Sequence, residues 1–269
     1  MELLPLFQNG GQHPVVLLNT KFLHMIPSTT MTPQEVGLST LENLSVADRL
    51  NQWMFDSIRP YVKGAVLEIG SGIGNISSCF VQNGMPLHVS DYSTDYCRML
   101  TGKFDTEPLI RDVLHLDLAT PDIESAYPKL IGKFNTAFAL NVVEHILDHQ
   151  LALANCYKLL APGGRVIILV PAYQVLYNGF DRELEHYRRY TRGSLRRLLE
   201  SQKFEVMRTW HFNFAGIFGW FWSGTVMGKK TLPAGELKFY NKLVPVFRVA
   251  DKVVGNSVGL SVIGVGVKN

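Results

Sequence analysis

One stretch of this chain carries most of the information about its fold: Val66-Leu67-Glu68-Ile69-Gly70-Ser71-Gly72-Ile73-Gly74-Asn75. Its first part is apolar apart from Glu68, as in a parallel strand that is covered on both faces. The three glycines that follow let the backbone turn tightly and approach a ligand closely. Residues 75–80 favour a helix, whose first N–H groups lack partners within the helix and point back toward the turn. The stretch therefore predicts a ligand site between a buried strand and a helix N-terminus.

A second acidic residue strengthens this prediction. Residues 87–90 favour a strand that ends at Asp91. In nucleotide-binding units, an acidic residue about twenty positions beyond the glycine turn accepts hydrogen bonds from ribose hydroxyls. Asp91 lies at this distance from the glycine turn, and Tyr92 follows it at the start of the next helix. The competing interpretation is that Asp91 only caps this helix.

The composition limits the classes of protein to which the chain can belong. With 269 residues, 46% hydrophobic and 18% charged, it can form one large α/β domain with additions, or two small domains. The net charge of +3 is too small to indicate nucleic acid as the main partner. Cys79, Cys97 and Cys156 fall in predicted helices without metal-ligand spacing, as buried thiols of a reducing compartment do. No signal peptide and no metal-binding constellation is visible, so we expect a cytoplasmic protein without a bound metal.

The spacing of the glycines distinguishes two classes of cofactor site. Dinucleotide sites use G-x-G-x-x-G/A, whereas here Asn75 occupies the place of the last small residue. The pattern G-x-G-x-G preceded by Glu68 resembles the first motif of class I S-adenosylmethionine (SAM) methyltransferases. A turn that is glycine-rich for steric reasons alone is the alternative. The resemblance implies SAM as the cofactor and the following binding residues: Glu68, Gly70, Ser71, Gly72, Gly74, Asn75, Asp91 and Tyr92.

A third strand, predicted over residues 108–111, ends at another acidic residue. By resemblance to the methyltransferases, Asp112 would receive the adenine amine and Val113 would supply a backbone N–H. Asp117, five positions after Asp112, is the alternative acid.

A fourth strand, predicted over residues 134–140, closes on Asn141-Val142-Val143-Glu144-His145. This sequence resembles the N-V-hydrophobic-E-H stretch of small-molecule methyltransferases. Ligands of parallel sheets lie at the carboxyl ends of the strands, so we expect Asn141 at the cofactor and His145 close to the acceptor. His145 is able to exchange a proton near neutral pH; a purely structural histidine is the alternative.

A polar, aromatic block over residues 171–191 follows a helix (149–160), a glycine turn (161–164) and a fifth strand (165–170). It resembles a group of bacterial SAM methyltransferases with the block D-R-x-x-x-H-Y-R-R-Y-T, here Asp181-Arg182 and His186-Tyr187-Arg188-Arg189-Tyr190-Thr191. Because the block follows a strand end, it should cover the cleft; a solvated charged loop is the alternative. The candidate bases are His145 and His186, and the candidate positioning groups are Tyr173, Tyr187 and Tyr190.

The last third of the chain combines two strands with an apolar insertion. We predict a helix to residue 201 capped by Thr191, a sixth strand over 204–213 and a seventh over 260–267. The charge-free aromatic segment 212–228 is shorter than the roughly twenty residues that span a bilayer. It is expected to form an apolar lid over the substrate or to dip into a membrane surface, and an amphipathic helix over 239–254 completes the insertion.

The N-terminal region is predicted with less detail. Residues 1–44 are predicted to form an arm or cap with two short apolar pieces, 15–18 and 22–26. The alternatives are a small hairpin, an arm packed over the ligand, and a loosely docked extension. Residues 45–62 favour an amphipathic helix with Ser45 as its cap.

Together these features predict an α/β fold, which by resemblance is a seven-stranded, doubly wound, mostly parallel sheet with an antiparallel last strand. Residues 45–269 form the SAM-binding domain, with an insertion at about 214–257. The predicted function is methyl transfer from SAM to a small, largely apolar or lipid-linked metabolite, without nucleic acid and with a peripheral membrane contact. The alternatives are a sugar or other polar acceptor, a nicotinamide-dependent oxidoreductase, and a SAM-binding protein without turnover. The atom methylated and the oligomeric state stay open.

Overall fold

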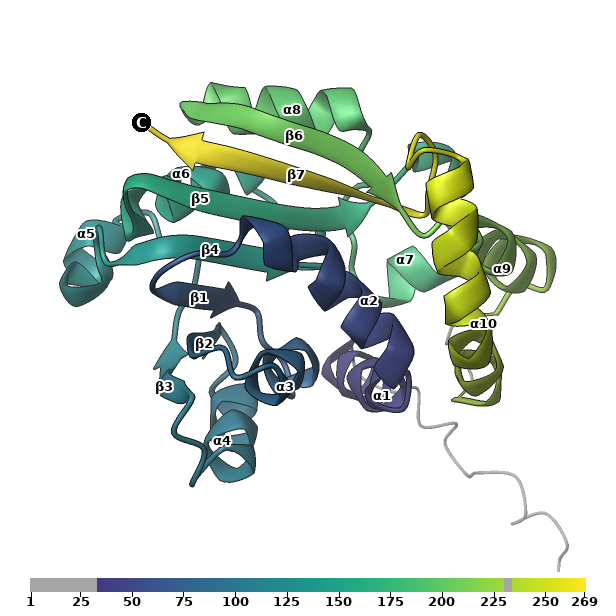
Figure 1. Cartoon of the computed structure of the whole chain (residues 1–269), viewed down its shortest axis with the longest axis horizontal. Coiled ribbons are helices and arrows are strands. Elements are labelled where there is room, and N and C mark those ends of the chain that lie inside the picture. Colours follow the sequence, from purple (N-terminus) through teal and green to yellow (C-terminus); the bar gives the residue numbers. More distant parts are fainter. Residues whose placement is uncertain (1–32, 230–233) are drawn as a thin grey trace, which may run out of the picture. The chain divides into compact units, whose positions relative to one another are not determined.

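Seven strands form one sheet in the computed structural model, which describes residues 33–229 and 234–269 (Figure 1). The strand order is β3-β2-β1-β4-β5-β7-β6, and every neighbouring pair is parallel except β5–β7 and β6–β7. The predicted seven-stranded, mostly parallel sheet with an antiparallel last strand is therefore confirmed. The strands are β1 (Val66–Ile69), β2 (Leu87–Asp91), β3 (Ile110–His115), β4 (Phe134–Leu140), β5 (Leu160–Pro171), β6 (Phe204–Phe212) and β7 (Ser261–Lys268).

Helices connect the strands and cover both faces of the sheet. The α-helices are α1 (Pro33–Ser45), α2 (Asp48–Ile58), α3 (Asn75–Gln82), α4 (Thr94–Lys103), α5 (Ile123–Ala126), α6 (His149–Leu159), α7 (Gly179–Glu183), α8 (Arg192–Ser201), α9 (Gly216–Trp220) and α10 (Ala234–Val253). Short 3₁₀ turns are η1 (Arg59–Tyr61), η2 (Pro128–Leu130), η3 (Val143–His145) and η4 (Gln174–Leu176), and η5 (Phe221–Val226) is a π-helix.

Hydrophobic side chains of the strands alternate between two core layers. In β5, Val166 and Ile168 pack in a cluster with residues of α6 and α8, whereas Ile167 and Leu169 pack in a second cluster with residues of α2 and α3. Successive residues of a strand point to opposite faces, so a strand covered on both faces is apolar throughout. This arrangement gives the doubly wound architecture.

The strand order places a ligand site at one edge of the sheet. The chain runs from β1 outward to β2 and β3, and then crosses back so that β4 pairs with the other side of β1. The carboxyl ends of β1 and β4 therefore flank a point where the winding direction reverses. Ligands of open α/β sheets bind at such a point.

Two strands differ in length from the predicted ones. Strand β3 continues to His115, beyond the predicted end at residue 111, and β5 begins at Leu160 instead of residue 165. In β5 the pairing with β4 shifts before Arg165, so the glycine turn 161–164 is retained as an irregularity within the strand.

Two helices replace the single one expected over residues 45–62. Ser45 does not cap α2: it ends α1, where its hydroxyl donates to the Glu42 carbonyl, and Ala47 precedes α2 without a side-chain cap. Helix α1, most of which falls within the predicted arm, packs against α2, α3 and α10. The apolar pieces 15–18 and 22–26 lie outside the described residues.

The insertion between β6 and β7 consists of α9, η5 and α10. Both carboxylate oxygens of Asp251 in α10 accept backbone hydrogen bonds at the end of β6, from Asn213 N and Phe214 N, each at 2.7 Å. Figure 1 shows α9 and α10 at the carboxyl ends of β4 and β5, together with α1 and α7. Within the described parts of the chain, none of the helices combines the length and the apolar character that crossing a bilayer requires.

Candidate active site

A cavity of about 1950 Å³ opens at the carboxyl ends of β1, β2 and β4. The glycine turn after β1 lines one part of it, and the segment after β5 and the insertion line another. Helix α1, which falls within the predicted N-terminal arm or cap, adds a wall whose individual residues the sequence pattern did not identify: Gly37, Thr40, Leu41 and Leu44. The predicted site residues that line the cavity are Glu68, Gly70, Ser71, Gly72, Asn75, Asp91, Tyr92, Asn141, His145, His186 and Tyr187.

Two glycines of the turn come close to neighbouring side chains. Gly70 and Gly72 have φ angles of +69° and +54°, which L residues rarely adopt. A Cβ atom at Gly70 would lie 2.4 Å from a Val142 methyl group, and one at Gly72 would lie 2.8 Å from a Leu41 methyl group. The turn thus has no room for a side chain between the cavity wall and the strand ends.

Gly74 has a different environment from Gly70 and Gly72. It does not line the cavity; it precedes helix α3 with a φ angle of +76°, and its Cα faces the side chains of Phe104 and Leu100. A small residue is needed there for packing beneath the turn. The structure thus places Gly74 beneath the turn, outside the cavity lining, and its predicted contact with the cofactor stays a prediction.

Glu68 lies in β1 beneath the turn and is 4% exposed. Ser77 of α3 donates a hydrogen bond to its carboxylate. Burial raises the pKa of Glu68 to about 7, although the hydroxyl groups of Ser77 and Ser71 act in the opposite direction. The carboxyl group therefore titrates near neutral pH.

This raised pKa makes a measurable contribution to the pH dependence of stability. The folded state binds the Glu68 proton more tightly than the unfolded state, so the free energy of unfolding should fall as the pH rises from about 4.5 to 7. Glu68→Gln lacks this titrating group. The difference in the free energy of unfolding between the variant and the wild type should therefore change by up to about 3 kcal/mol between these two pH values. Urea unfolding of the ligand-free proteins at several pH values measures it; parallel curves would contradict the assignment.

Asp91 ends β2 and is 3% exposed at the cavity wall. Its Oδ2 accepts from Gly72 N and its Oδ1 accepts from Ser93 N, both at 2.9 Å. Burial raises the pKa of Asp91, and these N–H donors oppose the rise. Each carboxylate oxygen retains a second acceptor site for a ligand hydroxyl. Asp91 thus ties the glycine turn to β2.

Asp112 and Val113, which the sequence pattern predicts as cofactor contacts, do not line the cavity. Because β3 extends to His115, both residues lie within the strand and away from the cavity. Asp112 is exposed and pairs with His88 Nδ1 at 2.6 Å. Asp117, the alternative acid, lines the cavity after the strand ends.

Three further predicted cofactor residues lie around the turn. Asn75 of α3 donates through its Nδ2 to the Leu41 carbonyl at 2.9 Å, which joins α3 to the α1 wall. Asn141 follows β4 with a φ angle of +55° and is exposed to the cavity. Tyr92 is 71% exposed, with its side chain at the rim.

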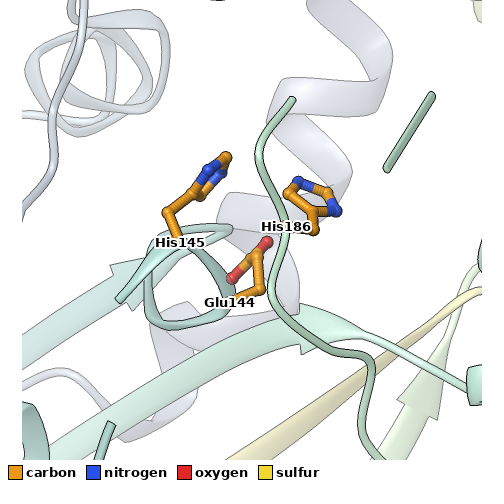
Figure 2. A group of neighbouring side chains, drawn as sticks. All are labelled: Glu144, His145 and His186. Atoms are coloured by element: carbon orange, nitrogen blue, oxygen red, sulfur yellow. The ribbon is translucent and has the colours of Figure 1, made fainter. Parts of the chain in front are cut away.

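A cluster of titratable groups lies at the carboxyl end of β4. Figure 2 shows the Glu144 carboxylate beside the rings of His145 and His186, which contact each other edge to face with their centres 4.6 Å apart. His145 lines the cavity, but the surrounding protein removes much of the water from its ring. This desolvation, together with the neighbouring His186, lowers the pKa of His145 to about 4. Burial raises the pKa of Glu144 to about 8, with Arg189 acting in the opposite direction. Sequence spacing gave no sign of this cluster, because His186 comes from a distant segment.

A buried network holds the segment that carries His186. Asp181 Oδ1 accepts from His186 Nδ1 and from Arg189 Nε, each at 2.8 Å. Burial alone raises the pKa of Asp181, but these hydrogen bonds outweigh it and hold the pKa below its usual value. The backbone N–H of Tyr187 donates to the Glu144 carbonyl at 2.9 Å. The block 171–191 thus covers the cleft as predicted, fixed by buried hydrogen bonds.

Tyr187 lines the cavity, but two other predicted positioning groups do not. Tyr190 is 3% exposed, and its hydroxyl forms a hydrogen bond with His149 Nδ1 at 2.8 Å. The hydroxyl of Tyr173 forms one with His211 Nε2 at 3.0 Å. Both rings pack within the fold, so the structure does not bring Tyr190 and Tyr173 to the cavity with Tyr187.

The chain belongs to the methyltransferase-domain family. Residues 45–209 match the family model described as "Methyltransferase domain". No curated protein matched the sequence. The family match and the doubly wound fold confirm the predicted methyltransferase class and argue against the nicotinamide-dependent oxidoreductase.

Solved structures with this fold are numerous, at low sequence identity. Phosphoethanolamine N-methyltransferase 2 of Haemonchus contortus in complex with SAM is 16% identical at a TM-score of 0.54, covering 90% of this chain and 58% of that one. This chain therefore spans little more than half of that enzyme. A SAM-dependent methyltransferase of Thermotoga maritima is 14% identical at a TM-score of 0.58, with coverage of 88% and 100%. One from Archaeoglobus fulgidus is 18% identical at a TM-score of 0.54, with coverage of 82% and 94%.

Proposed function

We propose that this methyltransferase binds SAM over the glycine turn and transfers its methyl group to a small, largely apolar or lipid-linked acceptor beneath the insertion. The size and lining of the cavity carry this proposal. A drug-sized ligand fills a pocket of about 300–1,000 Å³. A cavity of about 1950 Å³ therefore leaves room for an acceptor beside the cofactor.

The cofactor end has the groups that a nucleoside needs. Asp91 offers acceptor sites for ribose hydroxyls, and Asp117 lies on the same side for the adenine amine. The turn at Gly70 and Gly72 allows the backbone to approach the ligand, as it would the methionine portion of SAM. Dinucleotide sites place similar groups in the same positions.

The acceptor end is mostly apolar. Aromatic and aliphatic side chains from β6 and the insertion line it, with Glu236 as a charged exception: Phe212, Phe218, Trp220, Trp222, Met227, Leu237, Phe239, Leu243 and Phe247. His145, His186 and Tyr187 lie where this region meets the strand ends. A few polar groups in an apolar pocket orient a ligand, so these three are proposed to orient the reacting group.

The same insertion supports a peripheral membrane contact. Several of its large apolar side chains are exposed, among them Phe218, Phe221, Trp222, Val226, Met227 and Phe239. Apolar side chains of this kind insert at the interface of a bilayer. A lipid-linked acceptor would then reach the cavity from the membrane surface.

The chemistry requires little from the protein beyond alignment. The methyl group of SAM is electrophilic, so holding donor and nucleophile in line and close together supplies most of the rate. A base is needed only where the nucleophile must lose a proton. His145 has a low pKa and is neutral at pH 7, so it is able to accept one.

The first experiment measures release of S-adenosylhomocysteine with a matched panel of acceptors. The panel consists of pairs of compounds that carry the same hydroxyl or amine group. In one member of each pair this group is attached to an alkyl or isoprenyl chain, and in the other it is attached to a sugar. We expect turnover with the chain-linked members. Turnover with the sugars alone would favour the polar acceptor, and no turnover with either set would favour a SAM-binding protein without catalysis.

The second experiment tests the acceptor end directly. Trp222 lines the cavity and is 61% exposed, so Trp222→Ala removes apolar contact surface without opening the core. We expect KM for the apolar acceptor to rise about tenfold, in line with the burial of an aromatic side chain, with SAM affinity unchanged. The matched control is Phe221→Ala, because Phe221 is exposed beside Trp222 but does not line the cavity. Equal KM values for the two variants and the wild type would contradict the proposal.

A further inference from the structure

A buried carboxylate without a hydrogen-bond partner lies beside two imidazole rings at the inner wall of the cavity. Glu144 is fully buried, and neither of its carboxylate oxygens has a partner among the described residues. One ligand atom from each of Glu144, His145 and His186 lies within 4.8 Å of the other two (Figure 2). Small side-chain rotations would bring such atoms to about 2.0–2.2 Å from a shared ion.

Arg189, a buried cation close to this cluster, is already engaged elsewhere. Asp181 and Arg189 are both buried nearby, and the guanidinium of Arg189 donates to Asp181 and to the Ala172 carbonyl. The Glu144 carboxylate receives no hydrogen bond from Arg189 or from any other described residue. A buried polar group without a partner is costly, and a bound ion would supply one.

The orientation of His186 is that of a metal ligand. Its Nδ1 is bonded to Asp181 Oδ1, which leaves Nε2 available. In metal sites, the ring nitrogen that does not bind the ion commonly donates to a carboxylate, which fixes the tautomer and the ring. Asp181 is itself held by Arg189 Nε and by the backbone N–H of Asn178, so this second ring of contacts is already in place.

We propose that Glu144, His145 and His186 bind a divalent transition-metal ion at the acceptor end of the cavity. Two imidazoles and one carboxylate suit Zn²⁺, Fe²⁺ or Mn²⁺, whereas Mg²⁺ and Ca²⁺ prefer oxygen ligands throughout. His145 and His186 line the cavity, so the remaining coordination positions face it and can take an oxygen atom of the acceptor. Metal binding itself does not depend on the acceptor; only the role of the ion in methyl transfer rests on the proposed function.

The competing account is a protonated Glu144. A neutral carboxyl group tolerates burial, and the two histidines would then act without an ion. The two accounts differ in what the purified protein binds, which can be measured without SAM, acceptor or activity.

The test is a titration of the full-length, chelator-treated protein with Zn²⁺ in competition with a chromophoric chelator, followed by Co²⁺ absorption spectroscopy. We expect one equivalent of tightly bound ion, and at least about a tenfold loss of affinity in Glu144→Gln and in His145→Ala. His145→Ala is the safer variant for folding, because its side chain faces the open cavity. Thermal unfolding of each variant verifies that it is folded, and Zn²⁺ should raise the Tm of the wild type more than that of Glu144→Gln or His145→Ala.

Matched controls come from a second carboxylate–imidazole pair. Asp112 and His88 lie 2.6 Å apart on β3 and β2, outside the cavity and without a third ligand. Asp112→Asn and His88→Ala should bind Zn²⁺ as the wild type does. Absence of stoichiometric binding, or equal affinity in Glu144→Gln and the wild type, would overturn the metal site. Either result leaves the methyltransferase assignment untouched, because SAM binding and S-adenosylhomocysteine release are measured separately.

Discussion

Gly72→Val should lose SAM binding by at least about 100-fold in calorimetry while keeping its secondary structure. Gly72 has a φ angle of +54°, and a Cβ atom there would lie 2.8 Å from a methyl group of Leu41. A β-branched side chain would therefore strain the turn and occupy space between α1 and the bound cofactor. It would also displace the backbone N–H that now donates to Asp91 Oδ2.

The matched control for this variant is Gly84→Val. Gly84 follows α3 with a φ angle of +67°, and nothing lies within 4 Å of a Cβ atom built there. A residue with a side chain costs about 1–2 kcal/mol in this backbone region, so both variants should lose stability. Only Gly72→Val should lose SAM binding. Similar SAM affinities in the two variants would show that the turn is not the cofactor site.

Asp91→Ala should weaken SAM binding by about 1–3 kcal/mol, which is roughly 5- to 150-fold in Kd. The substitution removes the acceptor for the ribose hydroxyls and also leaves the N–H groups of Gly72 and Ser93 without their partner. Calorimetric titration of SAM into the variant measures the loss. An unchanged Kd would remove Asp91 from the site.

Two other acids of this region give a matched comparison. Asp117→Ala should also weaken SAM binding, because Asp117 lines the cavity after β3. Asp112→Ala should leave SAM affinity unchanged, because Asp112 pairs with His88 outside the cavity. A loss of SAM affinity in Asp112→Ala but not in Asp117→Ala would instead support Asp112 as the acid that binds adenine.

Much of the fold could be predicted because its signals are local. The apolar run before Gly70 predicted β1, and the glycines predicted the turn, since backbone conformation at positive φ depends on the residue itself. Thr191 caps the N-terminus of α8 as predicted, and its hydroxyl accepts a hydrogen bond from Ser194 N. Boundaries were less certain: β3 runs four residues beyond its predicted end, and that extension alone moved the candidate adenine-binding acid from Asp112 to Asp117.

The candidate site depended more on long-range packing. Aromatic residues of the block 171–191 looked alike in the sequence, yet Tyr187 lines the cavity and Tyr190 is buried against His149. Phe221 and Trp222 are neighbours in the π-helix η5, yet only Trp222 lines the cavity. The sequence pattern could not predict these orientations, because they follow from how the segment packs on its neighbours.

By itself, then, the sequence determined the methyltransferase-like α/β class, the glycine turn at residues 70–74 and the acid at Asp91 that ends the next strand. Such features depend on residues close together in the chain, whose conformations are set by local sterics and hydrogen bonding. Only the tertiary structure decided that α1 walls the cavity, that Asp117 lines it while Asp112 does not, and that Glu144 and His145 meet His186. These contacts join segments far apart in the sequence, and their geometry depends on strand lengths, register and side-chain packing.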